Sequence, residues 1–353
     1  MSSEIVDTSA RTVNLPAPTD ASNPVLKPSG RLDGAQPGGA APGVTPGVDV
    51  PDAEPGDPVS ARYAVVEEIG RGGMGRVLEA RDEALLREVA MKVMRSRKRV
   101  DADRFTVEAQ ITGQLDHPNV LPVYDYGVDD EGNPYFTMKL VRGHTSLAEL
   151  IDELREGGPR VRQWTFRKRV MLIQEVCRAL HYAHVRGVLH RDVKPDNIVI
   201  GAYGEVYVVD WGLACALSEG PQRACGVPRA SELEGQVAGT PCYMAPEMAE
   251  GLAPTRATDV YLLGALLHRL LVGRPPHQGV SLLNVVSAAL RNEVSPLTPS
   301  FPAPAGLVEL AERCLRTDPS ERFPSALELR EALARFLSGE ADRERSRELA
   351  AEA

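Results

Sequence analysis

Long apolar runs, basic charge and cysteines are all scarce in this sequence, and each shortage excludes a class of protein. The formal net charge of the 353 residues is −9, so a nucleic-acid-binding surface is not expected. The longest apolar runs, 170–183 and 260–272, contain charged or polar residues, and both are shorter than the roughly 18 residues of a transmembrane helix. We therefore expect no nucleic-acid partner and no membrane span.

The cysteine usage indicates a reducing compartment. The five cysteines form no C-x-x-C pair and are odd in number, and the N-terminus has no signal-peptide pattern. We expect reduced, mostly buried thiols in a cytoplasmic protein rather than a disulfide framework. The five residues are Cys177, Cys215, Cys225, Cys242 and Cys314.

Residues 1–60 are rich in Pro, Gly, Ala and small polar residues and contain no aromatic residue. Such a segment cannot bury enough apolar surface to offset the entropy lost on ordering. We predict a disordered tail that is dispensable for catalysis. The composition leaves open whether it is a passive linker or a docking and regulatory tail.

Strand patterns dominate the first third of the remaining chain, and helical periodicity dominates the rest from Leu147 onward. This order predicts an α+β protein with a β-rich lobe, a helical lobe and a cleft between them. The predicted elements are strands at 63–69, 77–81, 88–94, 123–128 and 135–140, a helix at 104–114, and short strands at 198–200 and 206–209.

A glycine-rich loop lies between the first two predicted strands. Its glycines let the backbone approach phosphates closely and direct amide N–H groups at them. The chain continues as a strand at Val77, whereas a dinucleotide-binding fold would begin a helix there. The loop reads Ile69-Gly70-Arg71-Gly72-Gly73-Met74-Gly75-Arg76-Val77.

A lysine, Lys92, ends the apolar strand V-A-M-K, where its charge suits the α- and β-phosphates of a nucleotide. A buried ammonium group needs a partner, and Glu108 on the predicted helix 104–114 is placed to supply it. Either residue alone would be read as a surface charge. Their position after the glycine loop favours an ion pair.

The segment H-R-D-V-K-P-D-N, residues 190–197, carries the strongest chemical signal. Phosphoryl transfer mainly requires that a protein position the reacting groups and neutralise the charge of the phosphates. Asp192 can accept a hydroxyl proton and Lys194 can approach the γ-phosphate. Asn197 and Asp210, the latter in D-W-G, offer the few hard oxygen ligands that suit Mg²⁺.

A second metal site is conceivable in the H-x-x-H pair of His181 and His184. The sequence offers no third ligand in helical register, so we expect these histidines to pack or to lie on the surface.

The motifs occur in a fixed order, which continues with G-T-P-C-Y-M-A-P-E and with Asp259 in D-V-Y-L-L-G. On these residues the chain resembles the eukaryotic-like protein kinases, most closely the bacterial serine/threonine members, from Tyr63 to Leu337. The resemblance implies a two-lobed kinase fold over 61–337. The implied parts are an N-lobe at about 61–138, a hinge at 139–142, a C-lobe at 143–337 and a charged tail at 338–353.

The resemblance implies transfer of the γ-phosphate of ATP, with Mg²⁺ or Mn²⁺, to serine or threonine of protein substrates in bacterial signalling. Transient self-association for autophosphorylation would accompany it. Lys194 is the mark of Ser/Thr rather than Tyr specificity. Asp192 resembles the catalytic base, and Thr240 the residue that contacts Asp192 and Lys194. Lys92 with Glu108 resembles the ion pair of the active state, and Asn197 with Asp210 the metal ligands. The implied nucleotide-binding residues are Ile69, Gly70, Arg71, Gly72, Gly73, Met74, Gly75, Arg76, Val77, Ala90, Lys92, Met138, Lys139, Val141 and Val199.

Further roles follow from the same resemblance. Glu247 of A-P-E is expected to pair with Arg322. Trp211 replaces the usual phenylalanine of D-F-G, and Lys139 stands where an acidic residue is common. Between Leu213 and Thr240 there is no threonine. Of the two serines there, Ser231 is the phosphorylation site we predict, with Arg191 as the partner of its phosphate.

Two rival functions remain to be weighed against an active protein kinase. A pseudokinase scaffold usually lacks the lysine or one of the two aspartates, and all three are present. A small-molecule kinase shares the catalytic loop but lacks the A-P-E segment that forms a shelf for peptides. The segment Met244–Glu247 therefore favours a protein substrate.

Overall fold

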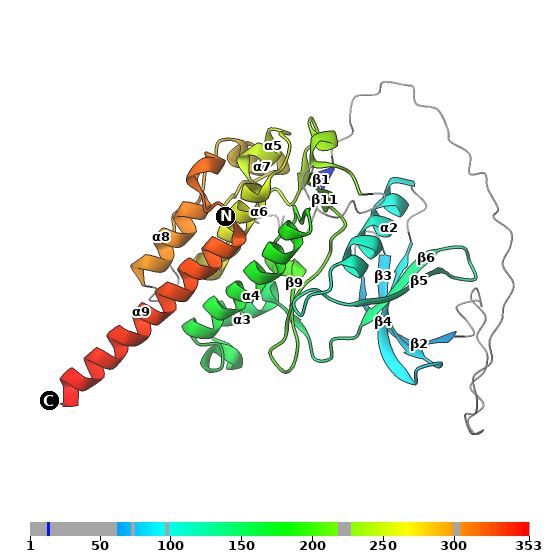
Figure 1. The fold of residues 1–353 in the computed structure, drawn as a ribbon, viewed down its shortest axis with the longest axis horizontal. Helices are drawn as coiled ribbons and strands as arrows, with labels where there is room; N and C mark the ends of the chain where they lie inside the picture. Colours follow the sequence, from blue (N-terminus) through cyan, green and yellow to red (C-terminus); the bar gives the residue numbers. More distant parts are fainter. Residues whose placement is uncertain are drawn as a thin grey trace, which may run out of the picture.

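The computed structural model describes residues 13–14, 62–71, 75–95, 99–217, 227–298 and 304–352; of residues 13–14, 99–100 and 340–352 it describes the backbone alone. Figure 1 shows two lobes, with a β-sheet and one helix on one side and a bundle of helices on the other. The predicted two-lobed α+β architecture is confirmed.

An antiparallel sheet of five strands forms the N-lobe, in the order β2-β3-β4-β6-β5. Its inward-facing side chains, among them Leu78, Val89 and Met91, are buried in one apolar cluster. Because these side chains pack on one face of the sheet, a slip of one residue would turn them to the other face, and this fixes the pairing register. The strands are β2 (Tyr63–Arg71), β3 (Gly75–Asp82), β4 (Arg87–Met94), β5 (Val123–Val128) and β6 (Pro134–Lys139).

Helix α2 (Arg99–Gln114) packs on this sheet through Phe105 and Ala109, which meet Phe136 of β6 in a second buried cluster. The rings of Phe105 and Phe136 lie 5.1 Å apart. This contact fixes the face of α2 that is turned toward β4 and so places Glu108 beside the sheet.

The C-lobe is built on one large apolar core that the buried faces of α4 and α6 share. Local signals define the helix ends. For α3, Ser146 and Glu149 form a capping box at the start and Gly157, with φ of 76°, ends the helix. The helices are α3 (Leu147–Glu156), α4 (Phe166–Val185), α5 (Pro246–Ala249), α6 (Arg256–Val272), α7 (Leu282–Leu290), α8 (Ala305–Cys314) and α9 (Ala326–Glu352).

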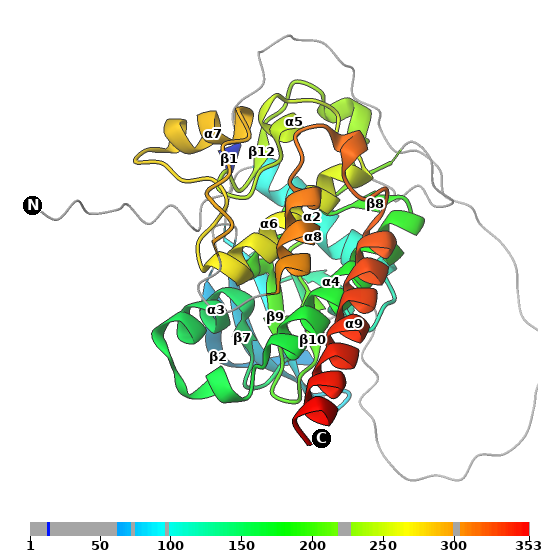
Figure 2. The ribbon, with the colours of Figure 1, turned by 90° about the vertical axis from the view of Figure 1, so that its left-hand side faces the viewer.

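Short strand pairs join the segments that surround the cleft. Strands β7 (Thr145–Ser146), β9 (Ile198–Ile200) and β10 (Val206–Val208) form one small sheet, and β8 (Val188–Leu189) pairs with β11 (Cys215–Ala216). A further pair joins β1 (Val13–Asn14), from the N-terminal segment, to β12 (Ala238–Gly239). Figure 2 shows β1 beside β12, although the two strands are far apart in the sequence.

The strands and the helix predicted from the sequence are all present, with ends that differ by a few residues. The main extension is at α2, which begins at Arg99 rather than at Arg104. The prediction of a disordered tail at 1–60 lies outside the described residues, except at Val13–Asn14, which form a strand. Helix α9 continues through most of the charged tail that was predicted at 338–353. No helix in the described part is long and apolar enough to cross a membrane.

Candidate active site

A cavity of about 370 Å³ lies between the sheet and the catalytic loop, residues 190–197. The nucleotide-binding residues predicted from the sequence line it, apart from Arg76, which does not, and Gly72, Gly73 and Met74, which lie outside the described residues. The predicted lining residues present are Ile69, Gly70, Arg71, Gly75, Val77, Ala90, Lys92, Met138, Lys139, Val141 and Val199.

Other residues of the cavity wall were not predicted. Leu121, Phe136, His144 and Val209 also line it, and Leu121 is buried with Val141 and Tyr207 in a cluster at its base. Phe136 could have been predicted from Met138, because the two residues lie two positions apart in the same strand and their side chains therefore point to the same face. Apolar walls with polar groups at one end suit a planar base attached to charged phosphates.

Lys92 and Glu108 meet at the polar end of the cavity. The Nζ of Lys92 lies 2.6 Å and 2.7 Å from the two carboxylate oxygens of Glu108. Burial alone would lower the pKa of Lys92, but the negative charges of Glu108 and Asp210 outweigh burial and raise it. The lysine therefore keeps its positive charge at this end of the cavity, in contact with Glu108 as the sequence predicted.

Asp210 and Asn197 line the same end of the cavity. The amide nitrogen of Asn197 donates to the backbone oxygen of Asp192 at 2.8 Å, so the amide oxygen is the atom that could bind a cation. These two oxygen donors fit Mg²⁺, which takes few protein ligands and fills its other positions with water and phosphate oxygens. Asp210 and Arg191 have positive φ angles of 63° and 68°. Such backbone is costly for residues other than glycine and concentrates at functional sites.

Asp192 lies in a buried network with Lys194 and Thr240. The Nζ of Lys194 donates to Thr240 Oγ1 at 2.8 Å and lies 3.0 Å from Asp192 Oδ2. Thr240 Oγ1 donates to Asp192 Oδ1 at 2.7 Å. Burial would lower the pKa of Lys194, and the charge of Asp192 outweighs it and raises the pKa. The resemblance predicted that these three groups meet, and the structure brings them together.

Asp259 at the start of α6 holds the catalytic loop from behind. Its carboxylate accepts the backbone N–H groups of His190 and Arg191, each at 2.9 Å, and lies 2.7 Å from His184 Nε2. Burial would raise the pKa of Asp259, but the hydrogen bond from His184 and the charges around it outweigh burial and lower it. The bond to Arg191 offsets the cost of its positive φ.

The role of Asp259 was not assigned from the sequence. The sequence did offer an indication, since Asp259 stands in the apolar run of α6 and a buried carboxylate requires hydrogen-bonding or charged partners. His184 is explained by the same contact. Among the described residues, no group of three or more His, Cys, Asp or Glu side chains could hold a metal ion, so the H-x-x-H reading has no support there.

Trp211 is buried next to the loop. Its ring lies 4.5 Å from the ring of His190, and its Nε1 donates to Val208 O at 3.4 Å. The larger indole ring is therefore accommodated where the family usually has phenylalanine, and its buried nitrogen has a hydrogen-bond acceptor.

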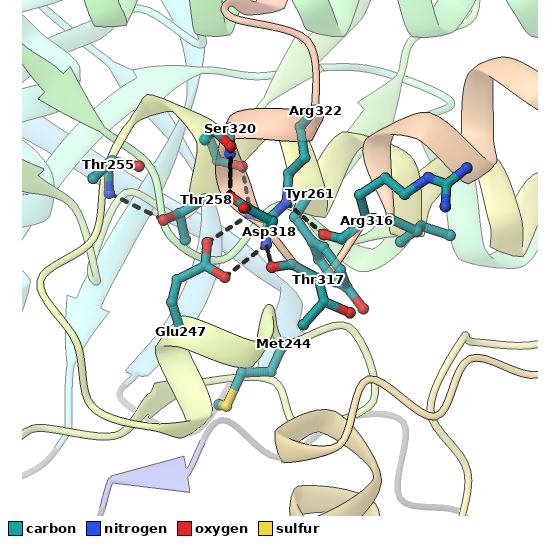
Figure 3. A network of polar contacts seen from close by, with 12 residues as sticks. Met244, Glu247, Thr255, Thr258, Tyr261, Arg316, Thr317, Asp318, Ser320 and Arg322 are labelled. Carbon is teal, nitrogen blue, oxygen red and sulfur yellow. Dashed lines mark hydrogen bonds and ion pairs between the residues drawn. The ribbon is translucent and has the colours of Figure 1, made fainter.

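The segment that follows Thr240 is fixed by a buried ion pair. Arg322 donates from Nη1 and Nη2 to the two carboxylate oxygens of Glu247, at 2.7 Å and 2.8 Å. The guanidinium also donates to the backbone oxygen of Ala257 and to those of Arg316 and Thr317 (Figure 3). Every donor of Arg322 is directed at an acceptor, so Glu247 is firmly anchored at the end of the segment that begins at Thr240.

Comparison with known proteins decides the family. The protein kinase domain family matches residues 63–333. The chain belongs to the protein kinase family. The kinase domain is 35% identical over 299 residues to the serine/threonine-protein kinase PknD of Protochlamydia amoebophila, an alignment that covers 79% of this chain and 30% of that protein. It is 33% identical over 305 residues to PknD of Chlamydia trachomatis serovar L2b, which covers 79% of this chain and 32% of that protein.

The chain is also 34% identical over 312 residues to PknD of Chlamydia muridarum, and this alignment covers 80% of this chain and 32% of that protein. The chain thus spans about a third of the length of these curated relatives. The family predicted from the motifs is confirmed.

Proposed function

We propose that this kinase domain is an active serine/threonine protein kinase that transfers the γ-phosphoryl group of ATP to hydroxyl groups of protein substrates. The observation that carries the proposal is the Asp192–Lys194–Thr240 network. It sets a proton-accepting carboxylate and a cation beside a cavity that already contains the Lys92–Glu108 pair and Asp210. Positioning and charge neutralisation are what phosphoryl transfer requires.

Each residue has a defined task in this mechanism. Lys92 binds the α- and β-phosphates, and Glu108 holds it in position. Asn197 and Asp210 would hold Mg²⁺ or Mn²⁺, which neutralises phosphate charge when bound. Asp192 accepts the proton of the substrate hydroxyl, and Lys194 stabilises charge on the transferred group. Thr240 keeps Asp192 and Lys194 in register.

Two observations favour a protein over a small molecule as the acceptor. The Glu247–Arg322 pair fixes a shelf after Thr240 on which a peptide could lie, and a strand of the chain itself pairs with β12 next to that residue. A cytoplasmic location belongs to the same proposal. The four cysteines in the described part are buried and unpaired, and burial raises the pKa of Cys242 to about 12, so its thiol stays protonated.

The test is transfer of labelled phosphate from ATP in the presence of Mg²⁺, with casein as a generic acceptor, followed by mass spectrometric mapping of the modified residues. We expect phosphoserine and phosphothreonine, and we expect loss of transfer with EDTA and in Asp210→Ala. Nucleotide binding without transfer would favour the pseudokinase reading. Transfer to small hydroxyl compounds such as choline or an aminoglycoside, but not to protein, would favour a small-molecule kinase.

A further inference from the structure

A second cavity, of about 1020 Å³, lies in the C-lobe and is more than twice as large as the nucleotide cavity. Its walls come from the short helix η1 (Pro159–Arg162), the first turns of α4 and the turn between β9 and β10. The catalytic loop, residues 190–197, all of which the structure describes, contributes no residue to it. We call this cavity the α4 groove. It is at the upper limit of small-ligand pockets, and its volume suits several side chains of a bound peptide.

Aromatic and apolar side chains in the α4 groove are left in contact with solvent. Tyr203, in the turn between β9 and β10, is 94% exposed, and Met171 of α4 is 46% exposed. Trp164 also lines the groove and is half-buried, packed against the C-lobe core. Aromatic residues and methionine are enriched at protein interfaces, where they bury a large area. The groove therefore has the composition of a surface that binds another protein.

One face of α4 forms a wall of the groove. Lys168, Met171, Leu172 and Glu175 line it, and side chains spaced three, four and seven residues apart lie on one face of a helix. The wall thus has an apolar middle with a charged residue at each end. Lys168 is exposed and makes no ion pair with any residue that the structure describes. Its ammonium group is available to a partner.

Positive charge is concentrated in the segment that contains η1 and the start of α4. Five of residues 159–169 are basic and none is acidic, in a chain whose net charge is −9. Within the described part of the chain, no ion pair involves Arg162, Arg167 or Lys168. The first turn of α4 also contains no acidic residue, although that end of a helix favours negative charge. The groove therefore borders a basic segment that lacks matching carboxylates.

The carboxylates that line the groove do not balance this charge. Glu175 is paired with Arg178 at 3.1 Å. Glu205 accepts the backbone N–H of Tyr203 at 3.0 Å. The cations without an ion-pair partner thus outnumber the carboxylates without one, and the groove is complementary to a negatively charged partner.

A peptide matches this surface better than a nucleic acid or a membrane does. The phosphates of a nucleic acid follow one another at every nucleotide, so some of them would face Glu175 and Glu205. A membrane surface does not enter a concave cavity. A peptide is able to place carboxylates beside Lys168 and apolar side chains against Met171 and Tyr203.

We propose that the α4 groove is a docking site for an acidic segment of a partner protein that carries apolar side chains between its acidic residues. The carboxylates pair with Lys168 and the basic segment, and the apolar side chains pack on Trp164, Met171 and Tyr203. The proposal does not depend on phosphoryl transfer, because the groove shares no lining residue with the nucleotide cavity. Both cavities can be occupied at the same time.

The experiment measures binding of a fluorescein-labelled peptide with a repeated Glu-Glu-Leu sequence to the full-length protein by fluorescence anisotropy. The variants are Lys168→Glu and Tyr203→Ser. Arg256→Glu is the control for the first, because Arg256 is also an exposed cation at the start of a helix, α6, and does not line the groove. Leu283→Ser is the control for the second, because Leu283 is 80% exposed on α7. Thermal unfolding shows that each variant is folded.

We expect the acidic peptide to bind wild type, with a Kd that rises by about tenfold or more in Lys168→Glu and in Tyr203→Ser. In the two controls the Kd should change by less than about twofold. Saturating ATP with Mg²⁺ should leave it unchanged, and a matched peptide with a repeated Lys-Lys-Leu sequence should bind more weakly.

Equal affinity of the acidic peptide for wild type, Lys168→Glu and Tyr203→Ser would overturn the inference. Displacement of the peptide by ATP, or tighter binding of the basic peptide, would do the same. Single-stranded DNA or vesicles of phosphatidylserine in phosphatidylcholine are tested in parallel. If either binds more tightly than the acidic peptide and loses that binding in Lys168→Glu, the groove belongs to a nucleic acid or a membrane instead. Absence of binding by every probe would contradict a docking role.

Discussion

The Lys92–Glu108 pair and the catalytic loop face the same cavity but are held in different ways. In the N-lobe, α2 is tied to the sheet by that ion pair, by the Phe105–Phe136 contact and by the exposed hydrogen bond between Thr106 and Tyr126. These contacts all lie within the N-lobe, so one helix and the sheet on which it packs hold the nucleotide side of the site.

In the C-lobe, by contrast, the catalytic loop forms hydrogen bonds with segments that are distant from it in the sequence. Asp259 accepts two of its backbone N–H groups, and Thr240 bridges Lys194 and Asp192. Behind them, Arg322 fixes the segment that carries Thr240 by way of Glu247. The acceptor side of the site is preorganised, which is the condition under which fixed charges contribute most to catalysis.

The largest effect that tests this contrast is on stability. Arg322→Ala leaves the buried carboxylate of Glu247 without its partner, and we expect the free energy of unfolding to fall by about 3–5 kcal/mol. Denaturant unfolding measures it. Arg316→Ala is the matched control, because Arg316 is exposed and contributes only its backbone oxygen to the network. Equal losses in the two variants would contradict the assigned role of the ion pair.

On the N-lobe side, Lys92→Met should lower kcat/KM by about 10²–10³, the usual loss when one fixed stabilising charge is removed. Glu108→Gln should act in the same direction but more weakly, because the amide can still accept a hydrogen bond. Steady-state kinetics of both single variants and of the double variant give the coupling. If the two losses simply multiply in the double variant, the residues do not act as a pair.

A smaller loss is expected where a hydrogen bond is removed from the preorganised side. Thr240→Val keeps the shape of the side chain but removes the bridge between Lys194 and Asp192. Bonds to charged groups contribute about 1.5–3 kcal/mol, so kcat should fall by roughly 10- to 100-fold. Thr240→Ser should restore most of it. A valine variant as active as wild type would show that the bridge has no part in the transfer.

The smallest effect concerns regulation. Arg191 Nη1 donates to Leu213 O at 3.1 Å, while its buried Nε has no hydrogen-bond partner among the described residues. Ser231 is exposed in the short helix η3 (Ala230–Leu233), so a phosphate could be added to it. Solvent and salt weaken charge interactions at an exposed position, so we expect Ser231→Ala to lower activity by about tenfold or less.

Ser338→Ala is the control for this variant, since Ser338 is exposed on α9. Phosphosite mapping of the active enzyme accompanies the assay. Full activity in Ser231→Ala together with an unmodified Ser231 in wild type would remove the regulatory role. Ser218, the other serine of the segment, lies outside the described residues.

Local patterns in the sequence were sufficient for most of the fold and for the reactive groups. Strand-type runs of residues indicated the strands of the N-lobe, and the order of motifs identified the family. Lys92 and Glu108 were expected to meet because a buried cation requires a partner. These are properties of short segments, so they can be read without knowing the tertiary structure.

The parts that were missed depend on contacts between distant segments. The pairing of Val13–Asn14 with β12 involves two residues in a proline- and glycine-rich region, too few for any periodicity to be visible. The support that Asp259 gives to His190 and Arg191 follows from the packing of α6 behind the loop. The residues on either side of such a contact do not indicate, from their own neighbourhood in the sequence, which distant segment they will meet.

The most direct test of the account is the turnover of Asp192→Asn. This variant keeps the size of the side chain but removes the group that accepts the hydroxyl proton, and a positioned base contributes about 10²–10⁴-fold to the rate. We predict a loss of kcat in that range, measured as Mg²⁺-dependent transfer to casein, with the Kd for ATP nearly unchanged. Turnover equal to that of wild type would contradict the central claim that this carboxylate receives the proton during transfer.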